Sequence, residues 1–167
     1  MSTGLTRRRL ARWLVPTAQL IVGGAIAVQV VVIGIRATFI LLAGIITGAV
    51  FQSFETYDAG IYIAGVSVDA AFVLAIIAAV SLFRQPSRRG ARFSVVAAAC
   101  YWVFIIADII ARFSALSDFY RRYPQRMGEL LDPRQIVVGA AAVVLAYLAS
   151  RLFVPTGQGA AETCEVE

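Results

Sequence analysis

The longest apolar run in the chain is Trp13 to Phe54, WLVPTAQLIVGGAIAVQVVVIGIRATFILLAGIITGAVFQSF. Its 42 residues contain one charged side chain, Arg36. An α-helix rises about 1.5 Å per residue, so about 20 apolar residues cross a hydrocarbon layer about 30 Å thick. The run is therefore long enough to cross a membrane, and it is about twice as long as one simple span requires.

Three shorter apolar runs follow it. Ala59 to Phe83 contains only Asp69 as a charged residue, Phe93 to Ala111 contains only Asp108, and Gln135 to Ser150 contains none. Together the four runs make up 102 of the 167 residues but hold 3 of the 25 charged side chains. Backbone groups inside lipid must bond to one another, and no run alternates between apolar and polar residues, so the pattern favours helices over a β-barrel. The sequence predicts an all-α, polytopic transmembrane helix bundle.

We expect one integral membrane domain over residues 1–167, with a disordered tail at 156–167. The expected spans cover about 14–54, 63–83, 93–113 and 135–154. The first segment allows three arrangements: one long or interrupted helix, two helices with Arg36 in a hairpin, or one span with a surface-lying or re-entrant piece. Four spans are favoured and five are possible. Gly44 and Gly48 form a GxxxG pattern, which allows close packing of helices in lipid.

The local distribution of arginine favours four spans over five. Arg84 to Arg92 is a short connection with four arginines and no acidic residue, and Arg7 to Arg12 is a second basic cluster. Short basic loops remain in the cytoplasm, which favours four spans with both termini inside. The chain has no lysine and no asparagine, whose codons are rich in A, but many arginines and alanines. We therefore expect a GC-rich bacterial genome and a multi-pass protein of the bacterial cytoplasmic (inner) membrane.

The absence of two residue types excludes several chemistries. The chain contains no histidine, which excludes bis-histidine haem, histidine-ligated metals and Ser-His or Cys-His relays. All 15 basic residues are arginines, so no lysine is present to form a Schiff base. Cys100 and Cys164 form no CxxC pair. We expect no enzymatic activity, no catalytic residue, no cofactor and no metal site.

Four ionisable residues are candidate intramembrane polar sites: Arg36, Asp69, Asp108 and Arg112. Placing such a group near the bilayer centre costs at least about 2.5 kcal/mol, so it indicates a structural or functional role. Asp108 and Arg112 are one turn apart and suit an ion pair, with a proton or ion path as the alternative. Asp69 is expected near the start of its span, where the helix dipole would stabilise a carboxylate. Arg36 is a hairpin tip, an interfacial residue or a partner of an intramembrane aspartate.

These features predict a non-enzymatic accessory, assembly or regulatory subunit. The spans are rich in small residues, and such a protein offers mainly helix surfaces to its partners. The expected partners are membrane lipids and either other membrane-protein subunits or further copies of the chain. The basic loops do not resemble a nucleic-acid-binding module, so no nucleic acid is expected. The alternative is an oligomeric ion or proton channel, or a small transporter, that uses Asp108, Asp69 and Arg36.

Overall fold

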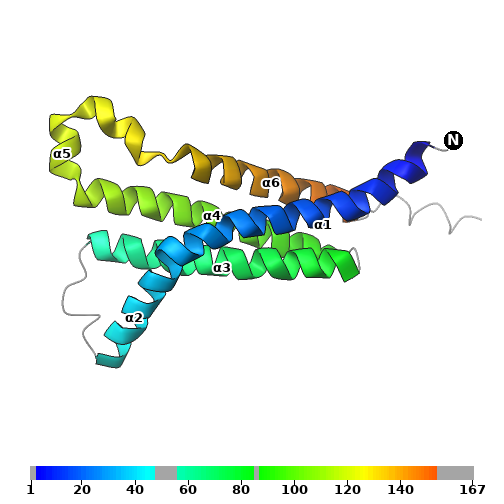
Figure 1. Cartoon of the computed structure of the whole chain (residues 1–167), viewed down its shortest axis with the longest axis horizontal. Helices are drawn as coiled ribbons and strands as arrows, with labels where there is room; N and C mark the ends of the chain where they lie inside the picture. Colours follow the sequence, from blue (N-terminus) through cyan, green and yellow to red (C-terminus); the bar gives the residue numbers. More distant parts are fainter. Residues whose placement is uncertain (1–2, 48–55, 85–86, 154–167) are drawn as a thin grey trace, which may run out of the picture.

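The computed structural model describes residues 3–47, 56–84 and 87–153, which are almost entirely helical and include no strand. The elements in chain order are α1 (Thr3–Gln29), the π-helical segment η1 (Val30–Gly34), α2 (Ile35–Thr47), α3 (Thr56–Arg84), α4 (Arg88–Ala115), α5 (Ser117–Arg122), the 3₁₀ segment η3 (Pro124–Leu130) and α6 (Pro133–Phe153). The long helices α1, α3, α4 and α6 lie roughly along one direction, with α2 and α5 at the end opposite the N-terminus (Figure 1).

Four segments of the described chain are long and apolar enough to cross a membrane. They are Trp13–Gly34, Ala59–Arg84, Arg88–Ala115 and Pro124–Leu152. This confirms the predicted all-α helix bundle with four spans, and it makes the chain a multi-pass membrane protein. Helix α3 is longer than the expected span: it begins at Thr56 rather than near residue 63.

The antiparallel pair α3 and α4 forms the most extensive helix contact in the described bundle. Ser87 caps α4, and its hydroxyl accepts a hydrogen bond from the Gly90 N–H at 3.3 Å. A Cβ atom on Gly90 would come within 2.9 Å of the Leu82 side chain. At the opposite end of the pair, a Cβ atom on Gly60 would lie 3.2 Å from backbone atoms of Ala111. Glycine at these two positions allows the helices to pack closely along their whole length.

The core of the bundle lies where α1 and α6 pack against this pair. Helix α1 contacts α3 and α6, and α6 also contacts α4. Tyr101 and Phe104 are fully buried at the centre, with their ring centroids 5.4 Å apart, and most of the buried residues around them are small. Lipid tails are as apolar as these side chains, so close packing rather than exclusion from water holds the helices together.

The π-helical segment η1 interrupts the first long helix. The Ile35 N–H donates to the Val30 carbonyl, five residues earlier instead of the usual four. Such a turn is a known cause of sharp bends in helices. The chain changes direction between α1 and α2 at this segment (Figure 1). As a result, α2 leaves the direction of the bundle and contacts only η1 and α3 among the described elements.

The described backbone decides one alternative for the first segment. It continues as a helix through Arg36, which excludes the hairpin at that residue. Helix α2 has 13 residues. Such a helix is about 20 Å long, which is shorter than a hydrocarbon layer of about 30 Å. Gly44 lies in α2, whereas Gly48 and the predicted disordered tail at 156–167 lie outside the described residues.

Candidate functional site

The Asp108 carboxylate is the centre of a polar cluster between α4 and α6. Its Oδ2 atom lies 2.7 Å from an Nη atom of Arg112, one turn further along α4. The Gln135 side-chain amide of α6 donates to the same oxygen at 3.2 Å. Asp108 and Gln135 are buried, while the Arg112 side chain keeps 39% of its surface exposed. The aliphatic part of Arg112 can therefore cover apolar surface while its charged end reaches toward the membrane interface.

Gln135 is the member of this cluster that the sequence analysis missed. It is a neutral residue in an apolar run, and the sequence does not indicate that α6 carries it to Asp108. The start of α6 nevertheless fixes its position. Asp132 caps the helix, because its Oδ1 atom accepts from the Arg134 N–H at 2.9 Å, and Pro133 is the first residue of α6. Gln135 then lies in the first turn, where it faces α4.

The Asp69 carboxylate forms a second polar contact, between α3 and the bent helix η1–α2. The Thr38 hydroxyl donates to Asp69 Oδ2 at 2.6 Å. The other oxygen, Oδ1, is buried, has no hydrogen-bond partner among the described residues and lies against Gly34. A Cβ atom on Gly34 would overlap with this oxygen, so only glycine leaves room for the carboxylate. In the same helix contact, a Cβ atom on Gly65 of α3 would overlap with the Ala37 side chain, so glycine is needed there too.

The helix-dipole explanation for Asp69 is wrong. We expected Asp69 near the start of its helix, but α3 begins at Thr56, thirteen residues earlier. The stabilisation of a carboxylate by a helix N-terminus falls off within the first turn. Asp69 therefore depends on its tertiary neighbours, chiefly the Thr38 hydroxyl and the space left by Gly34.

The remaining candidate residues, Arg36 and Gly44, both lie in α2. Arg36 is the second residue of α2, directly after the π-helical segment, and Gly44 lies two turns further along the same helix. The structure thus brings Asp108 and Arg112 together, and it assigns Asp69 to a different helix contact.

Two other buried polar groups were not predicted from the sequence. Gln19 of α1 is 2% exposed, and its Oε1 atom has no hydrogen-bond partner in the described part of the chain. The Tyr101 hydroxyl on α4 is also buried, and no described residue forms a hydrogen bond with it. Both residues lie in apolar runs, where a single glutamine or tyrosine is usual at a helix surface, so their burial is visible only in the folded bundle. Each unpaired group carries a free-energy cost, because lipid and apolar side chains offer it no partner.

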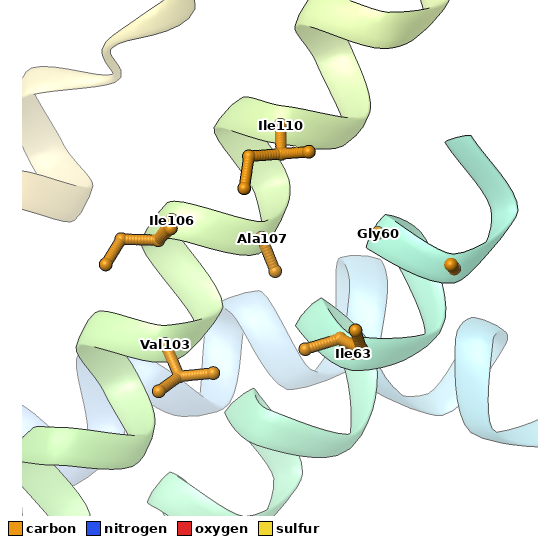
Figure 2. Close-up of a pocket in the computed structure, with 7 residues that line it drawn as sticks. Gly60, Ile63, Val103, Ile106, Ala107 and Ile110 are labelled. Carbon is orange, nitrogen blue, oxygen red and sulfur yellow. The ribbon is translucent and has the colours of Figure 1, made fainter. Parts of the chain in front are cut away.

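Two of the grooves on the described helices follow helix contacts. The first, about 280 Å³, lies between α3 and α4 and is lined by Gly60 and Ala107 with surrounding branched side chains (Figure 2). The second, about 410 Å³, lies between α4 and α6 and includes Trp102 and Tyr147. Neither groove includes Asp69 or Asp108 among its lining residues. The charged groups are thus used in helix contacts, whereas the grooves present apolar surface.

Comparisons with known proteins identify no relative. No protein-family description matches the chain, and neither the characterised proteins nor the solved structures contain a match. Functional proposals for this chain must therefore be based on its own residues. The two carboxylates are paired with side chains that stabilise helix contacts, and Arg112 and Gln135 offer Asp108 a cation and an amide donor.

Proposed function

We propose that the chain is a small non-enzymatic accessory, assembly or regulatory subunit of the bacterial cytoplasmic membrane. The observation that supports this most is the exposed apolar side of α2. Ile35, Phe39, Leu42 and Ile46 recur at four, three and four residues, and their exposed fractions range from 52% to 83%. This spacing places them on one side of the helix. They form a continuous ridge, which we call the α2 ridge.

The position of the α2 ridge suits a partner helix. The opposite side of α2 packs against α3, where Ala37 meets Gly65. Because η1 turns α2 away from the direction of the bundle, the ridge does not face α1, α4 or α6. Large branched side chains at this spacing fit between the side chains of another helix, as in helix pairs within membranes. The proposed partner is a transmembrane helix of another subunit or of a second copy of the chain.

The test is isolation of the protein from its native membrane in lipid nanodiscs, followed by measurement of the stoichiometry of any copurified subunit. We expect a fixed ratio for the natural chain and loss of the partner in the double variant Phe39→Ala with Ile46→Ala. The matched control is Val137→Ala with Val144→Ala, because these exposed residues of α6 are also seven positions apart. Recovery of the natural chain as a monomer with lipid alone would contradict the proposal.

A second candidate function follows from the unpartnered oxygen of Asp69. Among the described residues, the Oδ1 atom of this intramembrane carboxylate is buried without a hydrogen-bond partner, and an ionisable residue within a span is a candidate functional site. The alternative is therefore proton or ion movement by an oligomer, using Asp69, Asp108 and Arg36. Its test is proton or cation flux in liposomes, with Asp69→Asn and Asp108→Asn as variants. Equal flux from the natural chain and both variants would reject it.

A further inference from the structure

The groove between α4 and α6 has an unequal distribution of polar atoms. Its walls are formed by Val95, Ala99 and Trp102 of α4 and by Val143, Tyr147 and Ser150 of α6. Small residues, Ala98 and Ala146, form its buried floor. Trp102, whose ring packs against Gly139, lies at one end, and Ser150 lies at the other. The groove is apolar over most of its length and polar only toward the end of α6.

Three arginines continue the groove beyond this polar end. Arg92 precedes Val95 by three residues and Ala99 by seven, and Arg88 precedes Arg92 by four, so both lie on the groove side of α4. Arg151 follows Tyr147 by four residues on α6. The two helices are level here, because Ala91 and Ala149 belong to one buried cluster. All three arginines are exposed.

The Arg151 side chain is already oriented toward the groove. Its guanidinium lies over the Tyr147 ring, 5.5 Å from the centroid, and its Nε–H donates to the Tyr147 hydroxyl at 3.2 Å. This contact uses one of the five N–H donors of the guanidinium. Among the described residues, Arg88, Arg92 and Arg151 form no ion pair with a carboxylate. Their positive charge is therefore available to an anion.

We propose that this groove binds an anionic phospholipid. One acyl chain lies along Val95, Ala99 and Val143, and the phosphate is bound by Arg92 and Arg151, with Arg88 adding to the positive potential. A volume of about 410 Å³ is within the range of small-molecule sites and suits part of one acyl chain. Arginine binds phosphate through two parallel hydrogen bonds. Basic residues at the cytoplasmic end of an intramembrane groove are a known basis for recognition of anionic headgroups.

The groove between α3 and α4 shows why the charge matters. It is also open and apolar, and its lining residues, which include Ile63, Val103 and Ile110, carry no charge (Figure 2). Arg112 lies near this end of α4, but it is turned toward α6 and paired with Asp108. We therefore expect the groove between α3 and α4 to hold acyl chains without selecting among headgroups. The proposal is independent of the subunit function, because it involves neither α2 nor a protein partner.

The test uses the full chain in mild detergent and native mass spectrometry with two lipids of identical acyl chains, phosphatidylglycerol and phosphatidylcholine. We expect one phosphatidylglycerol to bind more tightly than phosphatidylcholine by on the order of tenfold or more, given two arginines at the headgroup. Arg92→Gln with Arg151→Gln should remove this preference. Arg121→Gln with Arg122→Gln is the charge-matched control at the opposite end, and it should leave the preference unchanged.

A second pair of variants tests the groove itself. Ala99→Phe fills the groove and should reduce binding of the phosphatidylglycerol, whereas Ala140→Phe places the same ring on an exposed site of α6 outside the groove. Circular dichroism of all variants shows whether the fold is retained. Equal affinity for the two lipids, or equal losses in the two double-arginine variants, would overturn the proposal. So would unchanged lipid binding by Ala99→Phe, or a dimer of the chain that occupies the groove.

Discussion

Asp108 and Asp69 each form a contact between described helices, and the two carboxylates are satisfied in different ways. Asp108 has a cation on its own helix, Arg112, and an amide from the neighbouring helix. Asp69 receives a hydrogen bond from the hydroxyl of Thr38, 31 residues earlier in the chain, and its second oxygen lies against a glycine. One site depends mainly on local charge and the other on the shape of a bent helix.

This difference shows how a membrane protein can hold an acidic group in two environments. An ion pair with a partly exposed arginine keeps the charge of Asp108 close to an interface, which lowers the cost of burial. At Asp69 the π-helical segment brings Gly34 and Thr38 to α3. The packing of η1 and α2 against α3 therefore depends on the position of this carboxylate. We therefore expect changes of shape to affect the Asp69 contact most, and changes of charge to affect the Asp108 contact most.

The largest effect is expected from Gly34→Leu. The new side chain would overlap with Asp69 and displace α2 from α3, and overpacking of this kind costs about 3 kcal/mol at the upper end. The control is Gly24→Leu, because nothing lies within 4 Å of a Cβ atom at Gly24. Unfolding in mixed micelles, followed by circular dichroism, measures both. Equal destabilisation by the two changes would contradict the tight contact at Gly34.

A smaller effect is expected when each aspartate is changed to asparagine. Asp108→Asn leaves Arg112 without its ion-pair partner and should lower the free energy of unfolding by about 2 kcal/mol, less than for a fully buried pair because Arg112 is partly exposed. Asp69→Asn keeps an acceptor for Thr38 and removes a buried charge, so a change below about 1 kcal/mol is expected. The same unfolding measurement compares them. The reverse order would contradict the greater dependence of Asp108 on charge.

A double-mutant cycle isolates the contact between Asp108 and Arg112. Asp108→Ala alone leaves an unpaired arginine, whereas the further change Arg112→Ala removes that charge. The double variant should therefore be less destabilised than the sum of the single variants, with a coupling energy of about 1 kcal/mol. Free energies of unfolding for the four proteins give this value directly. Additive effects would mean that the 2.7 Å contact contributes nothing to stability.

The smallest effect is expected from Thr38→Val, which removes the hydrogen bond to Asp69 without changing the shape of the side chain. Hydrogen bonds between membrane helices contribute about 0.6 kcal/mol on average, and this loss should be of that size. Thr17→Val is the matched control, because the Thr17 hydroxyl bonds to the Trp13 carbonyl of its own helix at 2.7 Å. A greater loss of stability in Thr17→Val than in Thr38→Val would show that the hydrogen bond between Thr38 and Asp69 does not stabilise the α2–α3 contact.

Part of the polar structure can be predicted from short sequence distances. The order of Asp108 and Arg112, one turn apart, already indicates an ion pair, and Asp132 followed by Pro133 indicates the start of a helix. Gln135 and Thr38 could not be found in this way, because each contacts a residue of another helix through a neutral side chain. The position of Asp69 was misjudged because the span was expected to begin near residue 63, whereas α3 begins at Thr56.

The sequence by itself determined the fold class and the use of membrane-spanning helices. Long runs with almost no charge lie in lipid, which offers no hydrogen-bond partners. Their backbone groups must therefore form hydrogen bonds within each helix. Tertiary structure alone decided the bend at Val30–Gly34, the direction of α2 and the partners of Asp69. These features depend on which small residues of different helices meet, as Gly34 meets Asp69 and Gly65 meets Ala37. Periodicity places a residue on a side of its own helix, but only packing determines which residue of another helix lies opposite it.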